Sequence, residues 1–246
     1  MKKIHFSIDD VFESLIEITD KKISLKKHFF YKELYKLWKK YGIRTGLHLF
    51  YEKKINGKLR TLKEVRSLKN ELKENWLFFN IHALNNNVPP YKQSPNDQKK
   101  TFNKIFKEIE RFAGKKYLTK YVRLHHYSES FELNNYFKKK KIIALFSTDR
   151  SVGSHRMPKK NSQELINLGE TKYKSLEFIK TDFRLEWIEN YNKKTITKKF
   201  KNCFDKKNRL IIYSHEYDFK RKKLRVALNK SMKILFQNFK VKVLKP

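Results

Sequence analysis

The chain has 246 residues and a mass of 30.0 kDa, with 39% hydrophobic and 15% aromatic residues. This apolar content excludes a wholly disordered chain, and the length suffices for one large domain with its own core. A single cysteine, Cys203, excludes a disulfide framework and a cysteine-based zinc cluster. No apolar run approaches the roughly 20 residues of a membrane-spanning helix. The N-terminal MKKIHFSIDD turns acidic too early for a signal peptide, so we expect a cytoplasmic protein without a transmembrane segment.

The charge is strongly positive, with 59 Lys and Arg against 25 Asp and Glu and a formal net charge of +34. A nucleic-acid partner is one explanation, because lysine-rich faces neutralise phosphates. The other is the composition of an AT-rich genome, which leaves the lysines as solvated faces. We favour the second, because lysine pairs are spread along the chain and no nucleic-acid-binding motif is present. No specific nucleic acid is expected, whereas electrostatic contact with an anionic membrane suits this charge.

Short apolar runs alternate with longer segments of helical periodicity. The first half predicts a strand over 4–8, helices over 11–18 and 31–41, a strand over 43–51, a turn at 56–57, a helix over 62–75, a strand over 76–82 and a loop over 85–97. The second half predicts a helix over 101–112, a strand over 121–125, a short helix over 133–139, a strand over 141–146, a loop over 148–165, an extended segment over 176–185, a helix over 186–200, a strand over 209–214, a helix over 222–239 and a strand over 241–244.

This alternation, with connections of crossover length, predicts a parallel sheet with helices outside. About seven strands, no internal repeat and no linker indicate an α/β fold, a single-domain distorted (β/α) barrel over residues 1–246. The C-terminal helix 222–239 is expected to pack on its outside. An open doubly wound sheet is the alternative, but no Gly-rich phosphate loop supports it.

Acids and imidazoles follow the predicted strands, at the end where a parallel barrel has its active site. They are Asp9, Asp10, His82, His125, His126, Asp149, Asp182, Glu186, His215 and Glu216. Scattered surface charge would not repeat this register so often. Singly, each has a structural explanation: the acidic pair can cap the next helix, and a lone histidine such as His48 can be a core residue. Together they are typical of a divalent metal site, for zinc, iron, manganese, cobalt or nickel.

Four segments carry a resemblance to a known family. They are Phe6-Ser-Ile-Asp-Asp10, Tyr41-Gly-Ile-Arg-Thr-Gly-Leu-His-Leu-Phe50, Arg123-Leu-His-His-Tyr127 and Leu210-Ile-Ile-Tyr-Ser-His215. Their order and spacing resemble the polysaccharide deacetylase superfamily, also called carbohydrate esterase family four, over most of the chain. A divergent branch has T-D-I-R-L-E and T-H-E patterns, to which Thr181-Asp-Phe-Arg-Leu-Glu186 and Ser214-His-Glu216 are similar.

The resemblance implies a distorted (β/α) barrel with one catalytic metal ion, for which we expect zinc. By position, Asp9 resembles the family's general base and Asp10 a metal ligand, and His82 falls where the family has its first ligating histidine. Arg123 lies where an arginine supports the catalytic aspartate. His215 corresponds to the late histidine that acts as general acid.

The sequence departs from the family at the second ligating histidine, which should follow His82 by four residues. Asn86 stands at that position. We expect His125 to complete the metal site, with His126 as the neighbouring alternative. His48 is a further candidate ligand, because a separate deacetylase-like barrel family has a G-L-H-L strand like the one that contains it.

The resemblance implies a hydrolase that removes an N-acetyl or other acyl group from a sugar. We expect the strand-end residues Asp149, Asp182, Arg184 and Glu216 to contact the substrate. The abundant lysines favour an anionic or phosphate-bearing carbohydrate. Two alternatives stay open: a catalytically inactive barrel that binds carbohydrate, and a basic metal-dependent nuclease.

Overall fold

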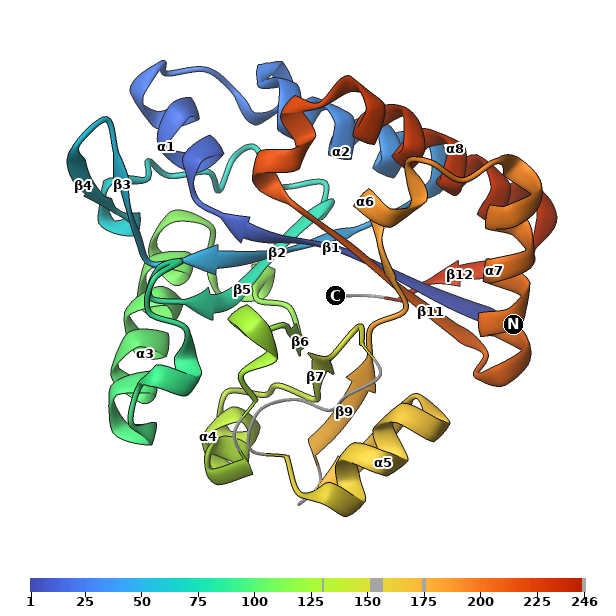
Figure 1. The fold of residues 1–246 in the computed structure, drawn as a ribbon. Helices are drawn as coiled ribbons and strands as arrows, with labels where there is room; N and C mark the ends of the chain where they lie inside the picture. The colour runs from blue at the N-terminus through green and yellow to red at the C-terminus, as the bar shows by residue number, and fades with distance from the viewer. Residues whose placement is uncertain (130, 151–156, 174–175, 245–246) are drawn as a thin grey trace.

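The computed structural model describes residues 1–129, 131–150, 157–173 and 176–244, arranged around a central parallel sheet (Figure 1). In this sheet β1 (Lys2–Val11) pairs with β11 (Arg209–His215) on one side and β2 (Thr45–Phe50) on the other. β5 (Leu77–Ala83) extends the sheet beyond β2, and β12 (Val241–Val243) pairs with the start of β1. Because these strands are parallel, their carboxyl ends meet at one edge of the sheet.

A second sheet lies next to the central sheet and forms the rest of the barrel wall. It holds β6 (Tyr121–Val122), β7 (Ala144–Ser147) and β9 (Leu176–Lys180) in parallel, with β8 (Glu170–Tyr173) antiparallel at its edge.

Contacts at both edges join the two sheets. At one edge, Leu118 bridges Phe79 of β5 in parallel, and the Thr119 N–H donates to the Phe79 carbonyl at 3.1 Å. At the other, the chain that forms β9 continues into β10 (Phe183–Arg184), which pairs with β11. The strands therefore follow one another around a distorted barrel, and the predicted α/β barrel class is confirmed.

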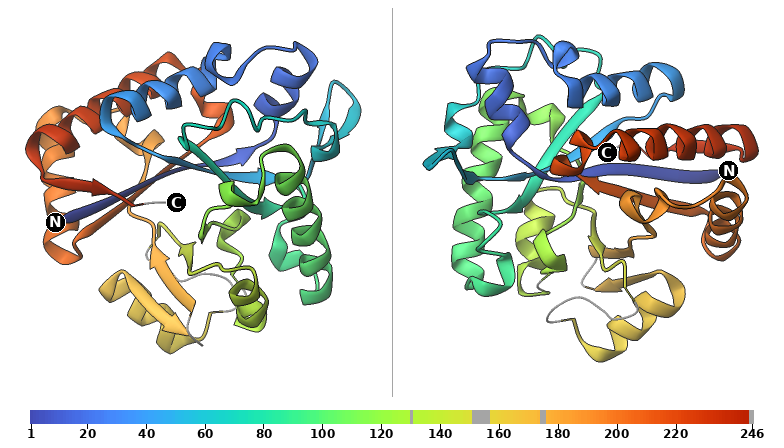
Figure 2. Two further views of the ribbon diagram at one scale, coloured as in Figure 1. Left: turned by 180° about the vertical axis from the view of Figure 1, so that it is seen from behind. Right: turned by 45° about the horizontal axis from the view of Figure 1, so that its top comes forward.

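Helices surround the strands, as the further views in Figure 2 show. They are α1 (Glu13–Asp20), α2 (Phe29–Tyr41), α3 (Pro95–Phe112), α4 (Asn134–Lys139), α5 (Lys159–Leu168), α6 (Leu185–Ile188), α7 (Lys193–Lys206) and α8 (Lys222–Asn238). The C-terminal helix α8 packs against α2, α6 and α7. None of these helices, in the part of the chain that is described, has the length and apolar character of a membrane span. That residues 1–246 form one domain stays a prediction.

Amphipathic spacing explains the helices that the sequence predicts well. In α2, the residues Phe30, Leu34 and Leu37 recur at helical spacing and are buried against the barrel. Gly42 then adopts φ +67°, a left-handed conformation that ends the helix at little steric cost.

The predicted helix over 62–75 is wrong beyond a single turn at Leu62–Glu64. Its apolar residues are buried, but tertiary contacts replace the helical hydrogen bonds. The Leu68 N–H donates to the carbonyl of Phe112 at 2.7 Å, and the Arg111 guanidinium donates to the carbonyl of Val65.

Two more of the differences from the prediction concern α5, α6 and α7. The segment 148–165, predicted as loop, ends in α5, while residues 151–156 lie outside the described part. The predicted helix over 186–200 is divided into α6 and α7. The division lies at Asn192, whose side-chain oxygen accepts the Thr195 N–H at 2.8 Å and caps α7.

Candidate metal centre and active site

An irregularity at the end of β1 brings two adjacent carboxylates to the same pocket. Neighbouring residues of a regular strand point to opposite faces. Here the pairing of β1 with β2 shifts register between Ile8 and Val11, and Asp10 has φ +60°. Such a bulge redirects side chains, and left-handed backbone is costly for a residue with a Cβ. As a result, Asp9 and Asp10 both line the pocket at the mouth of the barrel.

Asp9 is buried and held between two donors. Its Oδ1 accepts a hydrogen bond from Arg123 Nη1 at 3.1 Å and another from His48 Nδ1 at 2.8 Å. Burial alone would raise the pKa of Asp9. The Arg123 charge and the His48 hydrogen bond outweigh that effect and hold the pKa well below its usual range, so the carboxyl is ionised.

Arg123 is buried inside the barrel with its guanidinium fixed on several sides. It donates to Ser7 Oγ at 2.8 Å and to Thr181 Oγ1 at 3.3 Å, besides Asp9. Its guanidinium carbon also lies 4.3 Å from the centre of the Tyr213 ring. A buried charge is stable only when it is paired, so Arg123 and Asp9 depend on each other.

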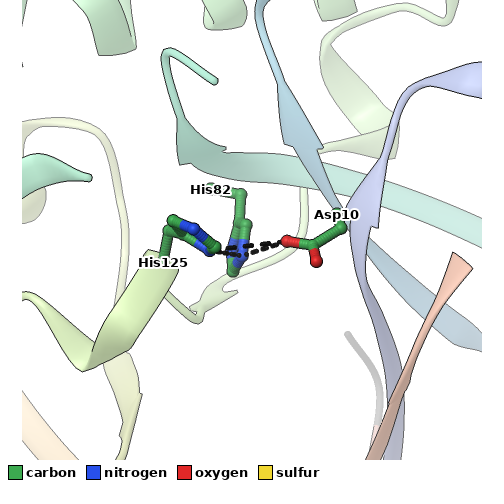
Figure 3. A group of neighbouring side chains, drawn as sticks. All are labelled: Asp10, His82 and His125. Atoms are coloured by element: carbon green, nitrogen blue, oxygen red, sulfur yellow. Dashed lines mark hydrogen bonds and ion pairs between the residues drawn. The ribbon is translucent and has the colours of Figure 1, made fainter. Parts of the chain in front are cut away.

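Three side chains from different elements of the barrel converge beside this pair (Figure 3). Asp10 Oδ1 lies 3.1 Å from His82 Nε2 and 3.4 Å from His125 Nδ1. The two imidazole nitrogens are 3.2 Å apart. Asp10 is the second-last residue of β1, His82 is in β5, and His125 begins the 3₁₀ helix η5 (His125–Tyr127) that follows β6.

The hydrogen bond made by Nδ1 of His82 determines the tautomer of its ring. Nδ1 lies 2.7 Å from the backbone carbonyl of Arg123, which can only accept. Nδ1 therefore carries the proton in the neutral ring, and Nε2 presents a lone pair to Asp10. Contacts with His125 and His82 outweigh burial and hold the pKa of Asp10 well below its usual range. An ionised carboxylate thus faces His82 Nε2, which is free to act as a ligand, and His125 Nδ1.

This arrangement fits a small divalent ion. Tetrahedral ligand atoms held about 2.0–2.1 Å from zinc lie roughly 3.3 Å from one another, close to the three separations found here. Asp10 Oδ1 is buried and has no hydrogen-bond donor among the described residues. Two imidazoles and one carboxylate form a donor set that catalytic zinc and iron sites use.

The alternative ligands do not join this group. His126 has φ +55°, so although it follows His125 its ring lines the pocket without sharing the three-atom cluster. His48 is fully buried and faces Asp9 instead. Asn86, at the position of the family's missing histidine, lines the same pocket.

His215 ends β11 and is the register partner of Asp9 on the neighbouring strand. Its Nδ1 lies 3.2 Å from Glu186 Oε1 and 3.7 Å from Asp218 Oδ2. Burial would lower the pKa of His215. The nearby carboxylates of Asp218 and Glu186, and the charges of Asp9 and Asp10, outweigh burial and raise it to about 9. The ring is therefore protonated at neutral pH.

Glu186, His215 and Asp218 form a second group with potential ligand atoms. Both of its carboxylates already have cationic partners. Arg184 lies 3.3 Å from Glu186, and Arg221 lies 2.9 Å from Asp218. A further cation would compete with these arginines, so we assign the two acids to holding His215 in its charged form.

The pocket has a volume of about 800 Å³, and the residues that line it include Asp9, Asp10, His82, Arg123, His125 and His215. Asp149 lies in its wall. Its Oδ2 accepts from Tyr213 at 2.8 Å, whereas its buried Oδ1 lacks a hydrogen bond in the described part of the chain. Arg184, Trp187 and Tyr217 line the pocket on the side of α6 and of the 3₁₀ helix η7 (Glu216–Lys220).

Two residues expected to contact substrate are not among the residues that line this pocket. Asp182 lies 2.8 Å from Lys207 Nζ and accepts the Ile211 N–H at 2.8 Å, so it secures β10 to β11. Glu216 turns away from the mouth and accepts N–H groups at the start of α1. Both side chains already have structural partners. The expectation that they contact the substrate therefore does not agree with their positions in the structure.

Sequence reasoning missed the supporting residues Asp218, Tyr127 and Tyr213. Tyr127 donates to Tyr213 at 3.0 Å, and Tyr213 in turn contacts Asp149. The spacing of Asp218 three residues after His215 was the available signal for its role.

The chain matches no protein-family model and no curated protein. It does resemble solved structures. A peptidoglycan N-acetylglucosamine deacetylase is 11% identical, with a TM-score of 0.56 over 98% of this chain and 86% of that one. A CE4 family pseudoenzyme is 11% identical, with a TM-score of 0.55 over 99% of this chain and 66% of that one.

The chain has the polysaccharide-deacetylase fold. The predicted resemblance is thereby confirmed at the level of fold. A 4-alpha-glucanotransferase from Thermococcus litoralis also shares this fold, at 14% identity and a TM-score of 0.58 over 99% of this chain. The match covers 39% of that enzyme. Since related barrels carry different activities, the chemistry must be argued from the site.

Proposed function

We propose that the protein is a metal-dependent hydrolase that removes an N-acetyl group from a sugar within a glycan. The observation that carries this proposal is the convergence of Asp10, His82 and His125 beside an ionised Asp9 in one pocket. The deacetylase fold supports it.

Asp10, His82 and His125 would hold the ion, and we expect zinc because this donor set suits it. A divalent ion bound there would polarise the acetyl carbonyl and lower the pKa of a water molecule in the pocket. The protein's contribution to metal binding is to fix the ligands. The Arg123 carbonyl sets the tautomer of His82, and the bulge at the end of β1 directs Asp10 toward the two rings.

Asp9 and His215 provide the proton transfers of amide hydrolysis. The Asp9 carboxylate accepts a proton from the attacking water as the new C–O bond forms. Protonated His215 then donates a proton to the sugar nitrogen as the C–N bond breaks. The products are acetate and a free amino sugar, and solvent restores the two protonation states. Arg123 and His48 keep Asp9 ionised and oriented throughout.

Asp149 and Arg184 are the proposed substrate contacts. Asp149 Oδ1 has no hydrogen bond among the described residues and lies 3.9 Å from Arg150 Nε, so it offers an acceptor for a sugar hydroxyl or amide N–H. Arg184 is partly exposed at the pocket and offers donors to an anionic group of the substrate. Arg184 supports a carbohydrate ligand that carries negative charge, whereas Asp149 suits a neutral hydroxyl or N–H group of the same ligand. A cytoplasmic location stays a prediction, as do the absence of a specific nucleic-acid partner and the contact with an anionic membrane.

The test is acetate release from N-acetylglucosamine oligosaccharides by zinc-loaded protein. We expect release by the native chain, and none by Asp10→Asn or after chelation. Binding of the oligosaccharide without acetate release would instead favour an inactive carbohydrate-binding barrel. The structural similarity to a CE4 family pseudoenzyme supports this alternative. Metal-dependent cleavage of plasmid DNA with no acetate release would favour the nuclease alternative.

A further inference from the structure

Two neighbouring helices form a surface with one sign of charge. α7 and α8 pack against each other on the side of the molecule away from α3 (Figures 1 and 2). Together they contain eleven Lys and Arg residues and a single acid, Asp205. Eight of the lysines are exposed, and we call them the α7–α8 basic face: Lys193, Lys194, Lys198, Lys201, Lys206, Lys222, Lys223 and Lys233.

These charges have no counter-charges. In the described ranges, none of the eight lysines forms an ion pair, whereas Arg221 immediately before α8 pairs with Glu189 and Asp218. Lys194 and Lys198 are like charges one turn apart, which destabilises a helix. Both helices also begin with two lysines, opposite to what the helix dipole favours. The stability of the helices therefore does not explain this arrangement.

A lysine-rich composition does not explain it either, because the charges are distributed unevenly. α3 has a similar length to α8 but mixes five basic residues with three acids, and α1 has three acids and no basic residue. Most protein surfaces intersperse both signs in this way. A surface of one sign raises the local concentration of oppositely charged ligands.

The basic face follows on from the candidate active site. α7 begins six residues after Trp187, and α8 begins five residues after Tyr217. Both aromatic residues line the pocket and are nearly half exposed. Lys223 Nζ donates to Asn190 Oδ1 at 2.7 Å, so the start of α8 lies beside the connection from α6 to α7. A chain-like ligand that leaves the pocket past these rings would meet the lysines.

We propose that the α7–α8 basic face binds the anionic groups of a polymeric glycan substrate while one N-acetylated sugar occupies the pocket. The ligand is a sugar chain that carries a carboxylate or phosphate on its repeating units. This inference rests on the proposed deacetylase function, which it makes more specific. A glycan is favoured over a bilayer because the exposed positions of α7 hold only polar residues, and those of α8 add one apolar side chain, Val226, which is too little to insert. It is favoured over nucleic acid because the basic face lies next to the pocket in which we propose that the amide of an N-acetylated sugar is hydrolysed.

The experiment compares binding of two oligosaccharides of equal length by calorimetry. Hyaluronan carries a carboxylate on every disaccharide and also contains N-acetylglucosamine, while the N-acetylglucosamine oligosaccharide is neutral. The test variant is K193Q/K194Q/K198Q/K201Q on α7, and K222Q/K223Q on α8 is a second. The matched control, K99Q/K100Q/K104Q/K107Q on α3, removes the same charge elsewhere. Thermal melting confirms that each variant folds.

We expect hyaluronan to bind more tightly than the neutral chain, and more weakly as salt rises from about 50 to 200 mM. The α7 variant should lose about tenfold in hyaluronan affinity and most of this salt dependence, because four cationic contacts are removed. The α3 control should stay within about twofold of the native protein. Neither set of changes should affect binding of the neutral oligosaccharide.

Equal losses in the α7 variant and the α3 control would overturn the proposal. It would also be overturned if duplex DNA, or vesicles containing phosphatidylglycerol, bound through the α7 lysines more tightly than hyaluronan. Acetate release is measured separately on the neutral oligosaccharide. Deacetylation without a role for the lysines rejects this inference alone. Lysine-dependent hyaluronan binding without any acetate release rejects the catalytic function and leaves a glycan-binding surface.

Discussion

His48 Nδ1 and Arg123 Nη1 both donate to the same oxygen of Asp9, Oδ1, at 2.8 and 3.1 Å. Burial lowers the pKa of His48, so the ring is neutral and its Nδ1 proton points at the carboxylate. Neither donor uses Oδ2, which remains for the proton that hydrolysis delivers. His48 is thus a positioning residue for Asp9. It contacts Asp9 and is not one of the three residues whose ligand atoms converge.

Replacing His48 should therefore lower turnover without removing the metal. We expect His48→Phe to reduce kcat by about 10- to 100-fold, with KM and zinc stoichiometry close to native, because Asp9 loses one orienting donor. His48→Asn keeps a side-chain N–H and should recover part of kcat. Steady-state kinetics and metal analysis check both. A loss of zinc in either variant would make His48 a ligand after all, and equal kcat in the Phe and Asn variants would exclude a role for the donor.

The adjacent histidines provide a matched pair for the metal centre. His125→Ala removes one of three converging ligand atoms and should lower zinc affinity at least about 100-fold, with loss of acetate release. His126→Ala changes the neighbouring side chain and should retain zinc at one ion per chain. Equilibrium dialysis against a zinc indicator measures both. Retention of zinc by His125→Ala together with its loss in His126→Ala would reverse the assignment.

Residues that follow the strands of a parallel barrel come together for a physical reason. The carboxyl ends of the parallel strands lie at one end of a barrel. Asp10, His82 and His215 therefore line one pocket independently of the loop conformations. Periodicity also located β5 and α8 to within a residue at most ends. These features depend on local patterns that the chain repeats.

What the sequence could not predict depends on single backbone angles and distant partners. The choice between His125 and His126 follows from the left-handed φ of His126, which no residue type dictates. The shared orientation of Asp9 and Asp10 likewise requires the bulge in β1. The segment 62–75 has helical periodicity but bonds to the end of α3 instead.

The protonation of His215 predicts the alkaline limb of activity. With its pKa at about 9, the general acid is charged at neutral pH and loses its proton above that value, so kcat should fall as the pH rises past about 9. Glu186→Gln removes a negative charge 3.2 Å away and should move this limb toward lower pH, in the direction of the ordinary value of about 6.5. The pH profiles of kcat for both proteins test this, and an unmoved limb would exclude His215 as the acid.

The same shift affects stability with a definite sign. The folded-state pKa of His215 lies above the unfolded value, so its protonation adds stability that is fully present below about pH 6.5 and is lost as the pH rises through about 9. Thermal melts across this range should show the loss in the native chain. The loss should be smaller in His215→Gln, which has no proton to lose; equal pH dependence in the two proteins contradicts the linkage.

Substitutions of Glu216 can distinguish a structural role of its side chain from a contact with the substrate. Its carboxylate accepts the N–H groups of Phe12, Glu13 and Ser14 at 3.1, 2.9 and 2.8 Å, at the start of a helix without a side-chain cap of its own. Glu216→Ala leaves these buried donors unpaired and should cost about 2–3 kcal/mol, or roughly 5–10 °C in Tm. Glu216→Gln keeps a carbonyl acceptor and should lose less. Zinc stoichiometry and oligosaccharide affinity should remain native in both, measured by dialysis and calorimetry. Weakened oligosaccharide binding at unchanged Tm would instead restore Glu216 to the substrate site.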